Sequence, residues 1–504
     1  MIRTRSRIQL GIFRVICNLL LSLLFAGDVS GNEVALKPYR AVPTERQLRW
    51  HEMEFYGFLH FGINTFTDRE WGMGDESPEL FNPTDFDANQ IVKLAKESGM
   101  KGLVLVCKHH DGFCLWPSRY TEHSVKASPW RGGKGDLVKE VSDACHAQGI
   151  KFGVYLSPWD RNHKDYGRPE YLTYYRNQLS ELLTNYGEVF MTWHDGASGG
   201  EGFYGGSREK RLIDNQSYYQ WPEIWDCVRK LQPKAVIFSD AGPDVRWVGN
   251  ERGAAGIPCW YTMELERCYP GMPNYFDHGK GHRGGRDWCP PECNISLRPW
   301  WFYHPRDDEK AKTSQQLVDI YYGSVGLGAS LNLNLSPDKR GRIADRDAEA
   351  LRGMHRWLDE TFAVDLARSA KMTASNVRRG TNALYAADNV IDGKRDTFWA
   401  TDDGETTPYI VAEFSEPISF NVIRIREYLP LGQRVMAFAL DQWKDGEWNE
   451  FFAGRSIGSQ RLVRVPRLNT SKIRLRITKS PVCPAISEFG VFEEPGQPSS
   501  IEHK

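Results

Sequence analysis

Long hydrophobic runs are scarce in this chain of 504 residues. The clearest run extends from Val15 to Ala26, follows a group of arginines and precedes several small residues. Because a membrane span needs roughly 18 apolar residues, this shorter run is typical of a secretory signal. An uncleaved membrane anchor is the alternative. We therefore expect residues 1–32 to be a signal peptide, and the mature protein to be secreted or periplasmic with no stable membrane span.

An excess of charge of one sign is also missing. The formal net charge is −1, and no stripe of lysine and arginine stands out along the chain. Nucleic-acid binding needs a concentrated basic surface, so we expect no nucleic-acid partner. Hydrophobic residues make up 40% and charged residues 26%, which is the composition of an ordinary globular protein.

Paired C-x-x-C motifs are missing from the cysteine pattern, which argues against a zinc site without excluding one. Of ten cysteines, Cys17 lies in the expected signal, so an odd number remains. At least one thiol should therefore be unpaired or bound to another chain. Four cysteines lie close together in the sequence and are candidates for local disulfides in an oxidising compartment. They are Cys259, Cys268, Cys289 and Cys293.

From about residue 50 to 365, within an expected catalytic domain of residues 33–365, short apolar runs alternate with amphipathic stretches. This alternation indicates βα units, and some eight of them over ~300 residues predict an α/β fold with a (β/α)8-like barrel. A doubly wound open sheet is the rival, but no G-x-G-x-x-G follows the first strand. The expected strands are Phe55–Asn64, Gly102–Cys107, Phe152–Ser157, Val189–Trp193, Ala235–Asp240, Trp260–Met263 and Ser330–Leu335, with another near Leu297–Tyr303. The expected helices are Asp87–Glu97, Asp136–Ala147, Glu170–Asn185, Tyr218–Leu231, Gln315–Val325 and Asp347–Phe362.

The character of the sequence changes after residue 368, where strand-length runs alternate in period two and no convincing helix occurs. This pattern predicts an all-β sandwich over residues 368–495. The runs are Tyr409–Phe414, Phe420–Glu427, Val435–Trp443, Lys472–Ile477 and Ile486–Phe492. Residues 496–504 are expected to form a disordered tail.

Polar and aromatic side chains stand where the expected barrel strands end. The clearest case is VFMTWHDGASGG, an apolar run that ends at Asp195 in a glycine-rich loop. Because the C-terminal ends of barrel strands meet on one face, such residues should converge there. The residues at or after these strand ends include His60, His109, His110, Tyr155, Trp193, Asp195, Arg246 and Glu251.

Paired carboxylates at such a face suggest hydrolysis of a glycosidic bond. One carboxylate attacks the sugar carbon or activates water, and a second, protonated carboxyl donates to the leaving oxygen. No serine or cysteine nucleophile with a paired base is indicated by the sequence. The structural alternative for Asp195 is a loop cap, since Asp-Gly is an ordinary turn signal.

Several motifs resemble the α-L-fucosidases of retaining glycoside hydrolase family 29. They are LHFGINTF, the EW of DREWGMG, KHHDGFCLWPS, VYLSPW, WHDGA and LNLNLSPDKRG, and the match covers roughly residues 40–365. The segment GPDVRWVGNE resembles the branch of the family that prefers fucose linked α-1,3 or α-1,4 on branched glycans. The resemblance implies a fucosylated glycan as the substrate.

The same resemblance assigns roles to individual residues. It implies that Asp195 is the nucleophile and that Glu251 is the general acid and then the base, with Glu292 as a competing candidate, a subsite residue or a structural residue. Arg246 would bind substrate or anchor the loop that bears Glu251 through an ion pair with Asp244 or Asp240. Fucose would contact His60, Trp71, His109, His110, Tyr155 and Trp193, and Trp300 and Trp301 are candidates for the leaving-group side. No metal or organic cofactor is needed for this chemistry.

The C-terminal region resembles discoidin-like modules (coagulation factor 5/8 type C) in NVIDGKRDTFWAT and AISEFGVF. Such modules often hold a structural calcium ion, here around Asp388, Asp392 and Thr397 with a late acid such as Glu488. They also often bind carbohydrate, and the alternative is a plain packing role beside the barrel.

Two other function classes remain open at this point. One is a non-catalytic glycan-binding protein built on an inactive barrel, which the intact Asp195 and Glu251 argue against. The other is a glycosidase of the same fold for another sugar, which only the resemblance of the histidine set opposes. Asn215, Asn294 and Asn469 lie in N-x-[S/T] sequons, which matter in a host that glycosylates.

Overall fold

The computed structural model describes residues 35–273, 278–380 and 383–496. The expected signal peptide and almost all of the expected tail lie outside these residues, so both stay predictions. In the part of the chain that is described, no helix has both the length and the apolar character that crossing a membrane would require.

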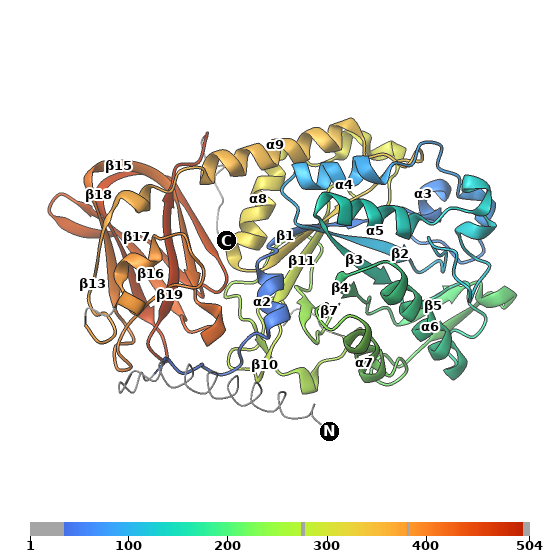
Figure 1. Cartoon of the computed structure of the whole chain (residues 1–504), viewed down its shortest axis with the longest axis horizontal. Helices are drawn as coiled ribbons and strands as arrows, with labels where there is room; N and C mark the ends of the chain where they lie inside the picture. Colours follow the sequence, from blue (N-terminus) through green and yellow to red (C-terminus); the bar gives the residue numbers. More distant parts are fainter. Residues whose placement is uncertain (1–34, 274–277, 381–382, 497–504) are drawn as a thin grey trace, which may run out of the picture. The chain divides into compact units, whose positions relative to one another are not determined.

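Eight parallel strands close into a barrel in the order β1, β12, β11, β8, β7, β4, β3, β2 (Figure 1), which confirms the predicted architecture. The strands are β1 (Phe55–Leu59), β2 (Gly102–Lys108), β3 (Lys151–Leu156), β4 (Val189–Trp193), β7 (Val236–Ser239), β8 (Val245–Trp247), β11 (Pro291–Ser296) and β12 (Ser330–Leu335). The interior is a packed core, as barrels of this size require, with Tyr56, Phe58, Tyr155 and Trp193 among its side chains.

Helices surround the barrel at the positions expected from the sequence, to within a few residues. They are α4 (Ala88–Glu97), α5 (Leu137–Gln148), α6 (Pro169–Asn185), α7 (Trp221–Leu231), α8 (Ser314–Ser324) and α9 (Asp345–Phe362), with α2 (Glu45–His51) and α3 (Ile63–Thr67) near the start. Helix α4 shows why these segments are helical. The Asp87 carboxylate caps its first turn by accepting from the Gln90 N–H at 3.1 Å, and Ile91 and Leu94 are buried on its inner face.

Two expected barrel strands were wrong. Thr262–Met263 (β9) pairs antiparallel with Asp287–Trp288 (β10) outside the barrel, and the strand expected near Leu297–Tyr303 lies earlier, at β11. The barrel strand next to β7 is β8, which spans only Val245–Trp247. The sequence did not predict β8, because three residues next to Gly242-Pro243 are too few to show the alternation of apolar and polar residues that marks a strand.

The C-terminal region forms a seven-stranded antiparallel sheet, which confirms the all-β prediction. Its strands are β13 (Lys371–Ala374), β14 (Trp399–Ala400), β15 (Tyr409–Glu427), β16 (Ala437–Lys444), β17 (Glu447–Arg455), β18 (Arg461–Lys479) and β19 (Ala485–Phe492). Strand β17 was not expected, because its apolar residues do not alternate in period two, and it has no fully buried position. Strand β15 joins two runs that the sequence separates.

The expected calcium ligands of this sheet domain are only partly available. Both carboxylate oxygens of Glu488 accept from guanidinium groups, those of Arg424 at 2.6 Å and of Arg426, so this carboxylate is already neutralised and does not fit a cation. Thr397 donates to Asp392 at 2.7 Å. Within the described ranges, no group of three or more His, Cys, Asp or Glu side chains is arranged to hold a metal ion. The structural calcium ion stays a prediction, without Glu488 as its ligand.

The expected local disulfides were also wrong. Cys259, Cys268, Cys289 and Cys293 are all free thiols, and three of them are buried. Closeness in sequence does not bring sulfur atoms together here, because the buried Arg246 guanidinium lies among these cysteines and donates to the Cys289 carbonyl.

Candidate active site

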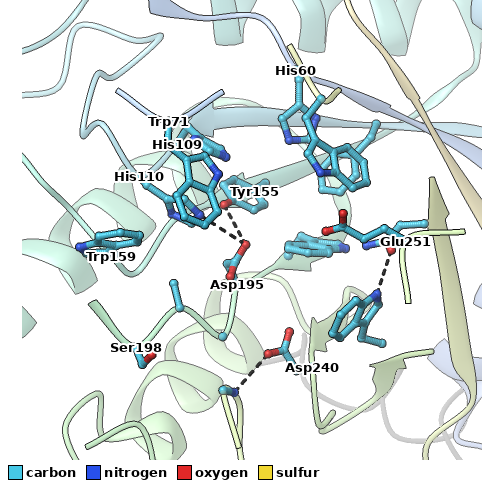
Figure 2. Close-up of a pocket in the computed structure, with 18 residues that line it drawn as sticks. His60, Trp71, His109, His110, Tyr155, Trp159, Asp195, Ser198, Asp240 and Glu251 are labelled. Atoms are coloured by element: carbon cyan, nitrogen blue, oxygen red, sulfur yellow. Dashed lines mark hydrogen bonds and ion pairs between the residues drawn. The ribbon is translucent and has the colours of Figure 1, made fainter. Parts of the chain in front are cut away.

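A cavity of about 310 Å³ lies where the barrel strands end (Figure 2). The structure brings eight of the ten expected site residues into its wall, although their positions in the sequence are far apart. They are His60, Trp71, His109, His110, Tyr155, Trp193, Asp195 and Glu251.

Asp195 lies two residues after the end of β4, and it lines the cavity. The Tyr155 hydroxyl donates to its Oδ2 at 3.3 Å, and His110 Nε2 lies 3.8 Å from the same oxygen. Burial raises the pKa of Asp195 to about 6, against hydrogen bonds from Tyr155 and the backbone that lower it. The group is therefore ionised only above mildly acidic pH.

The glycine after Asp195 is required by a close approach of loops. A Cβ on Gly196 would lie 1.7 Å from Oδ2 of Asp240 and 2.5 Å from the backbone nitrogen of Gly271. Oδ2 of Asp240 accepts from that same nitrogen at 3.1 Å, which ties the loop of Gly271 to the end of β7. The WHDG motif thus needs glycine for space.

Glu251 lies in the loop after β8, across the cavity from Asp195 in Figure 2. Burial raises the pKa of its carboxyl, and the negative charge of Asp195 raises it further, while a hydrogen bond with Trp301 opposes the rise. A carboxyl with a raised pKa opposite a second carboxyl is the pairing that a general acid and a nucleophile require.

Two histidines of the cavity are neutral and present the same ring atom. Burial lowers the pKa of His60 and of His110 to about 3. His60 Nδ1 lies 2.7 Å from Oδ1 of Asn334, whose amide nitrogen donates elsewhere, so Nδ1 carries the hydrogen. His110 Nδ1 likewise donates to the Ser157 hydroxyl at 2.7 Å, because that hydroxyl donates to the Trp159 carbonyl. Nε2 of both rings is therefore an acceptor, suited to a sugar hydroxyl.

The third histidine has an unsatisfied ring atom. Among the described residues, Nδ1 of His109 has no hydrogen-bond partner although the side chain is buried, and the nearest carboxylate oxygen, on Asp111, is 4.0 Å away. Burial and the neighbouring His110 and His60 hold the pKa of His109 well below its usual value. A buried polar atom without a partner in a cavity wall is consistent with a site that a polar ligand completes.

Strand β11 positions the indole rings of the cavity. Its alternate residues point to one side, and Glu292 accepts from Nε1 of Trp193 at 3.0 Å while Asn294 accepts from Nε1 of Trp247 at 2.9 Å. Trp193 also stacks on Phe238, with ring centroids 4.1 Å apart. Both indoles are thus held in place by side chains of β11, Trp193 by Glu292 behind the cavity wall and Trp247 by Asn294 within it.

Glu292 does not have the role expected of it. Its side chain is fully buried inside the barrel, where it also accepts from the Tyr56 hydroxyl and, at 3.2 Å, from the Asn332 amide. It does not line the cavity, so the prediction that it binds substrate or acts as the acid was wrong. Burial raises its pKa to about 7.

Arg246 is fully buried as well and does not line the cavity. Its guanidinium donates to the carbonyls of His278 at 2.7 Å, of Trp260 at 2.8 Å and of Cys289. The prediction that it binds substrate was wrong, and so was the ion pair with Asp244 or Asp240. Asp244 pairs instead with Arg46 and Arg229.

The cavity also contains residues that were not assigned to it from the sequence. Asp240 directly follows β7 and Trp159 lies three residues after the end of β3, so both belong to the strand ends that the sequence pointed to, although neither was given a role. Trp247 and Asn294 lie in β8 and β11, whose positions the sequence pattern did not reveal. Trp301, a candidate for the leaving-group side, does line the cavity.

Comparisons with known proteins agree with this geometry. The family model for α-L-fucosidases matches residues 39–361, and the F5/8 type C domain model matches residues 371–489. Alpha-L-fucosidase 1 of Arabidopsis thaliana is 40% identical over 481 residues, which cover 94% of this chain and 92% of that protein.

Solved structures show the same likeness. A putative α-L-fucosidase from Bacteroides thetaiotaomicron superposes with a TM-score of 0.83 at 37% identity, over 91% of this chain and 99% of that one. A glycoside hydrolase family 29 fucosidase from Ruminococcus gnavus, solved in complex with fucose, gives a TM-score of 0.83 at 30% identity, over 93% and 98% of the two chains.

Proposed function

We propose a mechanism and a substrate class for this chain, which belongs to the α-L-fucosidase family and is a glycoside hydrolase. It removes terminal α-linked fucose from oligosaccharides or glycoconjugates by double displacement, with retention of the anomeric configuration. One observation carries this proposal: Asp195 and Glu251 line a single cavity, and the charge of one raises the pKa of the other.

In the first step the Asp195 carboxylate attacks the anomeric carbon of fucose, while Glu251 transfers its proton to the leaving oxygen. The products of this step are a covalent fucosyl-enzyme and the free leaving group. In the second step Glu251, now ionised, takes a proton from water, and the resulting hydroxide attacks the same carbon and releases Asp195. Two inversions leave the configuration unchanged.

The cavity wall suits a deoxysugar. His60 and His110 offer Nε2 acceptors to two ring hydroxyls. The His109 ring, whose Nδ1 has no hydrogen-bond partner among the described residues, lies 4.2 Å from the His110 ring between centroids. Phe58 and Trp193, whose ring centroids are 5.0 Å apart, provide apolar surface for the ring carbons and the methyl group. Trp71, at 56% exposure, stands edge-on to His110 at the mouth of the cavity.

For the linkage, we propose fucose joined α-1,3 or α-1,4 to a branched glycan. The segment GPDVRWVGNE, on which this rests, forms β8 and the loop that carries Glu251. That loop borders both the fucose cavity and a second cavity of about 850 Å³, which has room for more than one further sugar. We also propose action outside the cytoplasm, on the signal-like residues 1–32 alone.

Proton NMR of the first product tests the mechanism. During hydrolysis of an aryl α-L-fucoside, a retaining enzyme releases the α anomer of fucose before mutarotation, and release of the β anomer would refute retention. A panel of branched and linear fucosylated oligosaccharides, read by released fucose, tests the linkage. Preference for α-1,2-linked fucose on linear glycans would contradict the proposed substrate class.

A further inference from the structure

The second cavity lies on the side of the site where the leaving group departs. It shares Trp71, Glu251 and Trp301 with the fucose cavity, so the proton donor stands on the wall between the two. Because Glu251 protonates the oxygen between fucose and its neighbour, the next sugars should enter this second cavity. Trp300, 49% exposed in its wall, offers an aromatic face on which a sugar ring can pack.

The carboxylates in this wall, apart from Glu251, are already engaged. Glu70 accepts from the backbone nitrogens of Trp301 and Phe302, both at 3.0 Å, and from His304 Nε2 at 3.0 Å. Asp319 forms an ion pair with Arg464 at 2.7 Å. Neither carboxylate is therefore available to bind a cation on a substrate.

Lys312 is a half-buried cation of the same wall that is not paired with any described carboxylate. Lys312 Nζ donates to the carbonyl oxygen of Ser296 at 2.7 Å, and nowhere in the described ranges does it form an ion pair with a carboxylate. Burial alone lowers the pKa of Lys312. A charge withdrawn from water without a counter-ion is costly, and an anion that enters the cavity would remove that cost.

Two other cations of the wall differ from Lys312. Arg298 is neutralised by Asp347 at 2.7 Å and by Asp308 at 2.8 Å. Arg252 is exposed next to Glu251 and makes no ion pair with any described residue, so it adds positive potential at the rim. Lys312 and Arg252 are thus the two cations of this wall that form no ion pair with a described carboxylate.

We propose that the second cavity binds a leaving group that carries an anionic substituent, a carboxylate or a sulfate ester on a sugar, with Lys312 as its counter-charge. The inference rests on the proposed function, since it assumes that fucose occupies the first cavity. It makes Lys312 a specificity-determining residue for the leaving group.

Matched fucosylated oligosaccharides test this inference. Three substrates differ only at one position of the leaving group, which is neutral, carboxylated or sulfated, and kcat/KM is measured on each. We expect wild type to prefer an acidic substrate by about tenfold or more, as for a hydrogen bond to a charged group, and to lose that preference at high salt. The two acidic arms distinguish carboxylate from sulfate.

The variants are chosen to separate this charge from general basicity. Lys312→Met should bring the ratio of acidic to neutral kcat/KM to about one, and Lys312→Arg should restore most of it. Lys310→Met is the matched control, because Lys310 is exposed, pairs with Asp307 at 2.8 Å and does not line the cavity. A preference that survives in Lys312→Met, or its absence from wild type, would overturn the proposal.

A binding measurement keeps the two proposals separate. Calorimetry with the acidic leaving-group oligosaccharide alone needs no turnover, and it should show binding to wild type that weakens about tenfold in Lys312→Met. If wild type hydrolyses none of the fucosides yet binds this acidic sugar through Lys312, the proposed function fails, and only the binding of an anionic sugar at Lys312 is left of the inference. Equal affinity of the two proteins sinks the inference alone.

Discussion

The indole Nε1 of Trp193 donates a 3.0 Å hydrogen bond to Glu292, a carboxyl that never reaches the cavity whose wall the indole forms. Tyr155 lies next to the same indole, with ring centroids 5.2 Å apart, and its hydroxyl donates to Asp195. The buried Glu292 carboxyl therefore fixes the Trp193 indole. That indole in turn supports Tyr155, whose hydroxyl donates to the proposed nucleophile. Several expectations for mutants and for pH follow from contacts of this kind.

Replacement of Glu292 tests this support. Glu292→Leu leaves the donors of Tyr56, Trp193 and Asn332 without their acceptor, so we expect a loss of roughly 2–4 kcal/mol in the free energy of unfolding. We also expect kcat/KM on an aryl α-L-fucoside to fall by about tenfold or more. Glu292→Gln keeps an acceptor oxygen and should lose much less of both. Denaturant unfolding and steady-state kinetics measure these effects, and equal losses in the two variants would contradict the role.

Removal of the nucleophile should abolish turnover without loss of the fold. In Asp195→Ala we expect kcat to fall by about 10⁴-fold or more, since no other group can form the covalent intermediate. The thermal midpoint should not fall, because a buried carboxylate with a raised pKa does not stabilise the fold at neutral pH. Circular dichroism and aryl-fucoside assays measure both. Near-normal rates would eliminate Asp195 as the nucleophile.

Removal of the acid should depend on the leaving group. Glu251→Ala should slow substrates with poor leaving groups by about 10²–10⁴-fold and those with good leaving groups much less, because only the former need the proton. Azide should restore part of the rate by attacking the fucosyl-enzyme. Glu292→Ala serves as the comparison. If that variant shows the leaving-group dependence and Glu251→Ala does not, the acid has been assigned to the wrong residue.

Activity should have a bell-shaped pH profile. Asp195 must be ionised, so kcat/KM should fall as pH drops through about 6, the raised pKa of its carboxyl. Glu251 must be protonated, so kcat/KM should also fall as pH rises above its own raised pKa. The two limbs belong to an interacting pair, and Glu251→Gln should remove the alkaline limb. An alkaline limb that persists in this variant would assign it to another group.

If the chain passes through a glycosylating pathway, we expect its sequons to differ in whether they carry a glycan. Asn215 is buried and donates to the Gly196 carbonyl at 3.0 Å, and Asn294 is buried in the cavity wall, so neither can carry a glycan in the folded protein. Asn469 is exposed. Peptide mapping after glycosidase treatment should find modification at Asn469 alone. Glycan at Asn215 or Asn294 on active enzyme would contradict the burial of these side chains.

The sequence predicted the barrel and the proposed nucleophile because long strands carry a strong signal. Strand β4 is an apolar run that stops at a polar motif, and the rule that barrel strand ends converge then places Asp195 correctly. Strand β8 is only three residues long, so the sequence did not predict that Trp247 lies at the end of a barrel strand. Glu292 was misassigned because the start of β11 was not known, and depth within a barrel depends on position along the strand. The disulfides failed because sequence distance says nothing about the direction of a sulfur atom.

Because Glu251 borders both cavities, the pKa of its carboxyl would depend on the leaving group that the second cavity holds. An anion held by Lys312 would sit on the outer side of this carboxyl and make loss of its proton less favourable, as Asp195 already does from the inner side. The pH at which activity falls on the alkaline side would then be higher for acidic glycans and unchanged for neutral ones. A measured pH optimum would accordingly describe an enzyme with a given glycan, and two laboratories using different fucosides would rightly report different values.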